Sequence, residues 1–331
     1  MRIVALEEHW SAPDLMARIN PATLAARGWP RPDGMPSAMA RGAELVEAGA
    51  GRLADMDRAG VSMQVLSAGG PGADLLDEAE ARRFARDYND RLARIAADHP
   101  ARFAGFAHLP IAAPDTAADE LERAVTQLGL KGAMVNGTVD GGFLDDRRFD
   151  PVLARAAALG VPLYLHPNLP PEAVRHAYYA GLPGHAGLLL GGPGFGQHVE
   201  TAIHVLRLVL SGTLDRHPDL KLIIGHMGEG LPTMLDRIEE VFADFAAAHL
   251  RRSVRRTLED QLWITTSGFF TLPPFLAALL TFGADRILFS VDYPFSANRT
   301  AVDFLRNLPV SPADRIKIAH ANADALLGLP A

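Results

Sequence analysis

The heptapeptide VALEEHW, Val4 to Trp10, places three ionisable residues directly after a short apolar run near the start of the chain. Ionised groups at the end of a buried strand are costly unless water, a partner group or a metal receives them. Side chains alternate along a strand, so Glu7 and His9 point to one face and Glu8 to the other. We therefore predict functional groups at the carboxyl end of this strand, with Glu8 turned toward helices or solvent.

Seven further apolar runs follow, and most are separated by segments in which apolar residues recur with helical spacing. The predicted strands cover residues 3–9, 61–67, 102–110, 131–137, 161–167, 220–226, 262–268 and 285–294. Strands that alternate with helices predict parallel pairing, and eight repeats predict a (β/α)8 TIM barrel. The alternative is an open doubly wound sheet. That fold would need a glycine-rich phosphate turn after its first strand, where ALEEHW stands instead.

We interpret residues 1–331 as a single barrel domain with loop insertions at about 11–50 and 168–197, both rich in glycine and proline. These insertions are predicted to lie over the C-terminal face of the barrel. Two helix starts are also predicted from capping residues. Asp115 is expected as the N-cap of one helix, and Ser311, followed by Pro312 at the first helical position, as the N-cap of the last.

The composition excludes several classes of function. The chain has 331 residues with 48% hydrophobic content, which suffices for a large core, and its net charge of -7 disfavours a nucleic-acid partner. It contains no cysteine, which excludes disulfides, thiolate metal sites and a cysteine nucleophile. There is no signal-peptide pattern and no uninterrupted apolar stretch of about 18 residues. We therefore expect a cytoplasmic protein without a membrane partner.

Four of the predicted strand ends carry residues that can bind a metal or transfer a proton: Glu7 with His9, His166, His226 and Asp292. In a barrel these ends meet at one face. Glu7, His9, His166 and Asp292 offer two oxygens and two nitrogens to one divalent ion, a set that suits zinc or manganese. Each residue alone has an ordinary structural explanation, but their joint occurrence favours a metal site. The other histidines are expected to be structural or solvated, for example His99, His108, His217 and His320.

The segments ALEEHW, LYLHPNLPP, IIGHMGEGLPTMLDRIE and RILFSVDYPF resemble the non-oxidative decarboxylases of the amidohydrolase superfamily. The similarity is greatest to ortho-hydroxybenzoate decarboxylases acting on γ-resorcylate or 2,3-dihydroxybenzoate, and it extends over nearly the whole chain. The resemblance implies a carboxy-lyase that acts reversibly on a small aromatic carboxylate. It also implies one divalent metal ion, Zn²⁺ or Mn²⁺, held by the four residues named above, and no organic cofactor.

The resemblance also implies roles for individual residues. Asp292 would protonate the ring carbon that bears the carboxylate. His226 and Glu229, in the GHMGEGLP motif, would be catalytic residues beside the substrate, and Arg237 would face the substrate or support Glu229. Tyr293 stands where relatives often have tryptophan, and we expect it to contact the substrate. Relatives also cover the substrate ring with an aromatic residue of the first loop, which cannot be aligned in this chain.

Two other classes of function remain open from the sequence. The same ligands could activate water for hydrolysis of an amide, ester or lactone, with Asp292 as the base. Hydrolases of this superfamily usually begin with His-x-His, and the binuclear ones place a lysine at the end of the fourth strand, whereas Lys131 stands at its start. A non-enzymatic metal-binding protein is disfavoured by the presence of His226 and Glu229. By analogy with relatives we expect a homodimer or homotetramer.

Overall fold

The computed structural model describes residues 1–30 and 34–330; residues 31–33 of the expected first insertion and residue 331 lie outside the described part. Every paired strand is parallel to its neighbour. The strands are β1 (Val4–His9), β2 (Met63–Ser67), β3 (Phe103–Gly105), β4 (Ala107–His108), β5 (Ala133–Asn136), β6 (Pro162–His166), β7 (Lys221–Ile224), β8 (Leu262–Thr265) and β9 (Ile287–Leu288).

These strands form two ladders, β1-β2-β3 and β4-β5-β6-β7-β8-β9, which together make a barrel. β3 and β4 together occupy one of the eight strand positions of the barrel. The Phe106 amide donates to the Leu66 carbonyl on β2, and the next amide, of Ala107, donates to the Gly132 carbonyl beside β5. Beyond β9, Glu8 and Tyr293 form a parallel bridge that brings the last strand position next to the first. The predicted (β/α)8 barrel is confirmed, and the open sheet is wrong.

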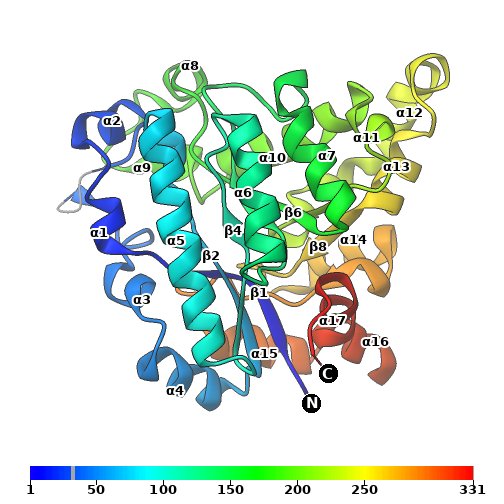
Figure 1. The fold of residues 1–331 in the computed structure, drawn as a ribbon. Helices are drawn as coiled ribbons and strands as arrows, with labels where there is room; N and C mark the ends of the chain where they lie inside the picture. Colours follow the sequence, from blue (N-terminus) through cyan, green and yellow to red (C-terminus); the bar gives the residue numbers. More distant parts are fainter. Residues whose placement is uncertain (31–33, 331) are drawn as a thin grey trace.

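Helices surround the strands on all sides, and the two chain ends lie close together at the bottom of the view in Figure 1. The α-helices are α1 (Pro13–Met16), α2 (Pro21–Ala26), α3 (Gly42–Val46), α4 (Ala50–Ala59), α5 (Glu78–Asp98), α6 (Pro114–Thr126), α7 (Asp150–Leu159), α8 (Glu172–Val174), α9 (Ala186–Gly191), α10 (Gly196–Leu210), α11 (Thr213–Arg216), α12 (Leu231–His249), α13 (Val254–Gln261), α14 (Leu272–Phe282), α15 (Asn298–Arg306), α16 (Pro312–Ile316) and α17 (Asn322–Leu327). Single π-helical turns follow α8 and α16.

The core has an inner and an outer layer. The inner cluster takes alternate residues from the strands, including Val4, Phe106, Tyr164 and Ile223, and packs at one end against α17. The outer cluster lies between the strands and the helices, and includes Phe84 on α5. Because burial of apolar surface is the main favourable term in folding, this arrangement fixes where each strand ends, and so where the polar strand-end residues lie.

Two buried histidines accept backbone hydrogen bonds outside the strand-end cluster. His204 Nε2 accepts from the Leu144 amide at 2.9 Å, and His108 Nε2 accepts from the Ala73 amide at 2.9 Å. Burial lowers the pKa of each of these histidines to about 4. For His108 the expected structural role agrees with this arrangement, since a neutral imidazole is needed to accept the bond.

His204 predicts a specific dependence of stability on pH. Its folded pKa of about 4 lies below the ordinary 6.5, so its contribution is present at neutral pH and is lost as pH falls from about 6.5 toward 4. A His204→Gln variant keeps an acceptor that does not titrate. Between pH 7 and pH 5 its free energy of unfolding should fall by about 2 kcal/mol less than that of the parent. Urea unfolding at both pH values measures the difference, and equal losses would contradict it.

Candidate active site

A register shift in β1 turns Glu7 and His9 into the barrel. Val4 and Leu6 face the interior, so regular alternation would next bring Glu8 inward. The pairing of β1 with β2 shifts register just before Glu8, and a bulge of this kind re-aims the side chains that follow. Glu7 and His9 therefore face the interior together, as predicted. Glu8 points away from them, but it is fully buried and does not reach solvent.

The four side chains predicted to bind a metal converge at this end of the barrel. One possible ligand atom from each of Glu7, His9, His166 and Asp292 lies within 4.8 Å of the others. His166 Nε2 is 3.2 Å from Glu7 Oε1, and His9 Nε2 is 3.3 Å from Asp292 Oδ1. His226 Nε2 lies 3.6 Å from the same Glu7 oxygen. The geometry thus brings together all four proposed ligands, with His226 beside them.

The hydrogen bonds of Glu7 show that this cluster fits a divalent cation. Glu7 Oε2 accepts bonds from Ser267 Oγ at 2.6 Å and from the Tyr164 hydroxyl. Glu7 Oε1 is buried without a hydrogen-bond partner, and so is His9 Nε2. Burial alone would raise the pKa of Glu7, but the surrounding histidines outweigh it and hold that pKa below its ordinary value. A buried carboxylate oxygen that faces imidazole nitrogens is the donor set that a metal such as zinc or manganese uses.

Asp292 is held in position through Glu8. Asp292 has φ +69°, a left-handed conformation that is costly for a residue with a side chain. The amides on either side of it donate to the Glu8 carboxylate, from Val291 at 2.8 Å and from Tyr293 at 3.2 Å. Burial raises the pKa of Glu8 to about 8, although the Val291 hydrogen bond acts in the opposite direction. Glu8 therefore serves the site by fixing the backbone around Asp292.

His226 and Glu229 lie in a tight turn after β7. His226, Met227 and Glu229 have φ values of 53°, 56° and 55°, which bends the chain sharply. The turn brings Glu229 Oε1 to 2.8 Å from His226 Nδ1 and leaves His226 Nε2 facing the ligand cluster. Burial alone would lower the pKa of His226, but the charges of Glu229 and Glu7 raise it to about 10.

His198, on α10, belongs to this motif and was missed by the sequence analysis. Its Nδ1 atom is 2.6 Å from Glu229 Oε2, so Glu229 lies between two histidines. The sequence analysis grouped His198 with the histidines expected to be structural or solvated, whereas the structure places it beside Glu229 and His226. Nothing in the spacing could have revealed it, because the chain returns from α10 to the turn after β7 only through tertiary packing.

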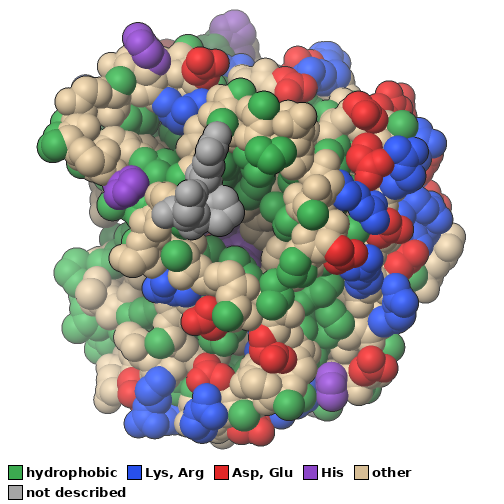
Figure 2. Space-filling model, turned by 90° about the vertical axis from the view of Figure 1, so that its left-hand side faces the viewer, with side chains coloured by type: hydrophobic (Ala, Val, Ile, Leu, Met, Phe, Trp, Pro, Cys, Tyr) green, Lys and Arg blue, Asp and Glu red, His purple; other side chains and the backbone are tan. Residues whose placement is uncertain are grey.

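A cavity of about 260 Å³ adjoins the cluster and is lined in part by His9, His166, His226 and Asp292. Its uncharged polar side chains are Ser11, Asn168 and Gln197, and no lysine or arginine lines it within residues 1–30 and 34–330. Its apolar lining comes mainly from the first insertion, with Trp10, Met16, Trp29, Met35, Met39, Leu45 and Phe295. The insertion thus supplies one aromatic ring, that of Trp29, to the cavity, although the sequence offered no alignable aromatic residue. Figure 2 shows hydrophobic side chains around a hollow on the face that carries this insertion.

Two residues predicted to contact the substrate do not line this cavity. Arg237 lies on the exposed side of α12, with Nη1 3.1 Å from Glu240, and it neither faces the cavity nor supports Glu229 in its own chain. The half-buried ring of Tyr293 lies under the Arg52 guanidinium, 4.7 Å from it. Its backbone amide donates to Glu8 at 3.2 Å, and its side chain does not line the cavity. Phe295, two residues later, lines the cavity instead.

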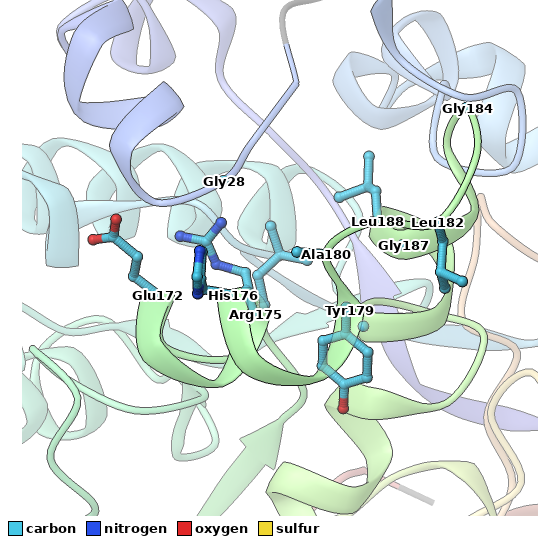
Figure 3. Close-up of a pocket in the computed structure, with 13 residues that line it drawn as sticks. Gly28, Glu172, Arg175, His176, Tyr179, Ala180, Leu182, Gly184, Gly187 and Leu188 are labelled. Carbon is cyan, nitrogen blue, oxygen red and sulfur yellow. The ribbon is translucent and has the colours of Figure 1, made fainter.

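A larger cavity, of about 410 Å³, lies under the second insertion away from the ligand cluster. Figure 3 shows Arg175, His176 and Tyr179 around it, below Gly28. The Arg175 side chain already donates to the carbonyls of Pro170 and Ala26, each at 3.0 Å. It therefore joins the two insertions. No candidate metal cluster is found at this cavity among the residues that the structure describes.

The comparisons with known proteins agree with this geometry. The amidohydrolase family model matches residues 17–329. The chain belongs to the amidohydrolase family. It is 38% identical to the γ-resorcylate decarboxylase of Rhodococcus jostii (strain RHA1) over 98% of each chain. It is 40% identical to the γ-resorcylate decarboxylase of Rhizobium sp. (strain MTP-10005), over 84% of this chain and 86% of the relative.

Solved structures extend the comparison to the fold. A 2,6-dihydroxybenzoate decarboxylase in complex with 2,6-dihydroxybenzoate superposes with a TM-score of 0.86 at 35% identity, over 99% of this chain and all (100%) of the other. A dihydroxybenzoic acid decarboxylase from Polaromonas sp. JS666, with bound manganese and the inhibitor 2-nitroresorcinol, gives 0.86 at 36% identity over 99% of this chain and 97% of the other. The resemblance to the decarboxylase branch is confirmed. None of the described helices is both long enough and apolar enough to cross a membrane.

The ligand cluster predicts which substitutions abolish metal binding. His166→Asn removes one of the four proposed ligands, so we expect affinity for a divalent metal to fall by more than about 100-fold. His226→Asn should retain about one metal per chain, because His226 lies outside the set of four. Elemental analysis after dialysis against a metal buffer distinguishes the two variants. Equal metal content in both would show that the ligand set is different.

Proposed function

We propose that this protein is a metal-dependent, non-oxidative decarboxylase of ortho-hydroxybenzoates. The observation that carries the proposal is the unpartnered Glu7 oxygen within a four-residue ligand cluster, at the wall of an apolar cavity. The names of the relatives, γ-resorcylate and 2,6-dihydroxybenzoate decarboxylases, support the same reaction. The cavity has room for one substituted benzene ring, and its apolar lining favours such a ring over a peptide or a sugar.

Glu7, His9, His166 and Asp292 would hold the metal. When bound there, the ion supplies Lewis acidity toward the carboxylate and the adjacent phenolate oxygen of the substrate. Manganese is supported by two structural neighbours, the Polaromonas enzyme above and a 5-carboxyvanillate decarboxylase from Novosphingobium aromaticivorans complexed with manganese. The oxygen and nitrogen ligands also suit zinc. We propose one divalent ion per chain, Mn²⁺ or Zn²⁺.

The side chains of the site would carry out the proton transfer. Asp292, in its protonated form, would donate its proton to the ring carbon that bears the carboxylate. Cleavage of the bond to the carboxylate then releases carbon dioxide, and the bonding electron pair restores the aromatic ring. His226 Nε2 faces the same space and would stabilise negative charge on the substrate oxygens. The apolar lining excludes water and strengthens both interactions. The steps are reversible, so carboxylation is expected at high bicarbonate.

The proposal is tested with a panel of γ-resorcylate, 2,3-dihydroxybenzoate, salicylate and 5-carboxyvanillate. Metal-loaded protein should release carbon dioxide from at least one of these acids, and Asp292→Asn should lower kcat by about 10²-fold or more because it lacks the proton donor. The matched 3-hydroxybenzoate, which has no hydroxyl beside the carboxylate, should not react. If metal is bound but no acid is decarboxylated, hydrolysis of an amide, ester or lactone becomes the better hypothesis.

We also propose that the chain forms a homodimer or homotetramer. Exposed apolar side chains gather on α12 and α14, two helices that pack against each other. They are Met234, Val241, Phe245, Leu272, Leu276 and Leu280. An apolar patch of this kind typically marks an interface. Arg237 lies on α12 as well, away from the cavity of its own chain, so its proposed contact with substrate would have to be made in the site of a second chain.

The proposed interface predicts that one charged residue introduced on α14 changes the oligomeric state. Leu280, which is 84% exposed on α14, should be buried by a second copy, so Leu280→Glu should shift the protein toward the monomer. Ile316→Glu, at an exposed apolar residue on α16, is the matched control and should leave the assembly unchanged. Light scattering coupled to size-exclusion chromatography gives the mass of each variant. A monomeric parent protein, or identical masses for parent and Leu280→Glu, would contradict the assignment of this face.

A further inference from the structure

His198 makes two polar contacts, and both connect it to functional parts of the site. Its Nδ1 atom is 2.6 Å from Glu229 Oε2, and its Nε2 atom is 3.2 Å from the Pro193 carbonyl oxygen. The other oxygen of Glu229 is 2.8 Å from His226 Nδ1. Pro193 lines the cavity and belongs to the second insertion. A single side chain on α10 thus links the cavity wall to the turn that carries His226.

Both ring nitrogens of His198 face oxygen atoms that can accept hydrogen bonds. A carbonyl oxygen can only accept a hydrogen bond, so Nε2 must donate to Pro193. Burial alone would raise the pKa of Glu229, but the charge of His226 and the hydrogen bonds from both histidines outweigh it and hold that pKa below its ordinary value. The Glu229 carboxylate thus offers one oxygen to each histidine, and His198 Nδ1 lies 2.6 Å from its Oε2 atom.

We propose that His198 is a positioning residue that fixes the Glu229 carboxylate and, through it, aims His226 Nε2 into the cavity. This proposal rests on the proposed function, in which His226 contacts the substrate. The ring centroids of His198 and His226 are 4.6 Å apart, and Phe269 packs edge-on against both rings, at 5.5 and 5.8 Å. The two imidazoles and the carboxylate between them therefore form one packed unit.

Loss of His198 would leave one Glu229 oxygen without its donor in a side chain that is fully buried. A buried carboxylate oxygen without a partner is costly, so Glu229 would rotate or take up a proton. Either change weakens the bond to His226 Nδ1 and frees the His226 ring to turn. His198 does not contact Glu7, His9, His166 or Asp292, so the metal cluster should be unaffected.

Three variants test this role. His198→Phe removes both donors, and His198→Asn restores a single amide donor toward Glu229. His217→Phe is the matched control, because His217 Nε2 is 3.1 Å from Asp150 and its side chain has the same 12% exposure, but the pair lies away from the cavity. All three are compared with the parent as metal-loaded protein for metal content, thermal unfolding, kcat and KM.

We expect His198→Phe to lower kcat by about 10- to 100-fold, as outer partners of a functional site do, with KM changed less than about threefold. His198→Asn should recover part of kcat, and His217→Phe should retain the parent value. Metal content should be unchanged in every variant. The proposal is overturned if His198→Phe keeps kcat within about twofold of the parent at full metal content. It is also overturned if His198→Phe and the control His217→Phe both lose kcat in proportion to a loss of thermal stability.

A spectroscopic measurement separates this proposal from the proposed function. In protein labelled with ¹⁵N-histidine and loaded with diamagnetic zinc, the ring-nitrogen signals of His198 and His226 report on their two hydrogen bonds to Glu229. The Nδ1 proton of His226 should shift or disappear in His198→Phe and stay unchanged in His217→Phe. If the parent decarboxylates no acid of the panel, the proposed function fails, and these signals alone decide the linkage. An unchanged His226 signal in His198→Phe would overturn it.

Discussion

The site depends on one buried anion, the carboxylate of Glu7. One of its oxygens is satisfied by Ser267 and the Tyr164 hydroxyl, and the other is buried among histidine nitrogens without a hydrogen-bond partner. An uncompensated charge in a barrel interior would be strongly unfavourable. The histidines and Asp292 surround this oxygen, and we propose that a divalent cation held among them compensates the charge. Because these residues come from distant parts of the chain, this requirement connects the chemistry of the site to the closing of the barrel.

Glu8, on the other side of β1, fixes the backbone that carries Asp292. Its carboxylate accepts the amides of Val291 and Tyr293, and so holds Asp292 in its left-handed conformation. The same segment pairs with the end of β1 through the bond from the His9 amide to the Tyr293 carbonyl at 2.7 Å. The interactions that bring the last strand position to the first are thus also those that place Asp292. Barrel closure and the placement of Asp292, the proposed proton donor, cannot be varied independently.

Much of the fold could be predicted from the sequence, because apolar runs and turn residues are local signals. The strand positions follow from them, and Ser311 with Pro312 does begin the last helix. Asp115 is not the N-cap, because Pro114 favours the first helical position and moves the N-cap back by two residues, to Ala113. The ligand cluster was predictable because strand ends meet in a barrel. The β1 register shift, the direction of the Tyr293 ring and the contact from His198 depend on tertiary packing, which leaves no periodic signal.

The site divides into two parts that obey different constraints. The groups proposed for the chemistry are attached to strand ends and are fixed by hydrogen bonds, which tolerate little displacement. The cavity wall comes largely from the insertions and includes Met16, Met35 and Met39, whose flexible thioethers can adapt to different ring substituents. Substitutions in the wall can therefore change which aromatic acid fits while leaving proton transfer intact. His198 connects the two parts, since it bonds to Pro193 in the wall and to Glu229 in the turn. A shift of the second insertion at Pro193 would consequently be transmitted to His226 through His198 and Glu229.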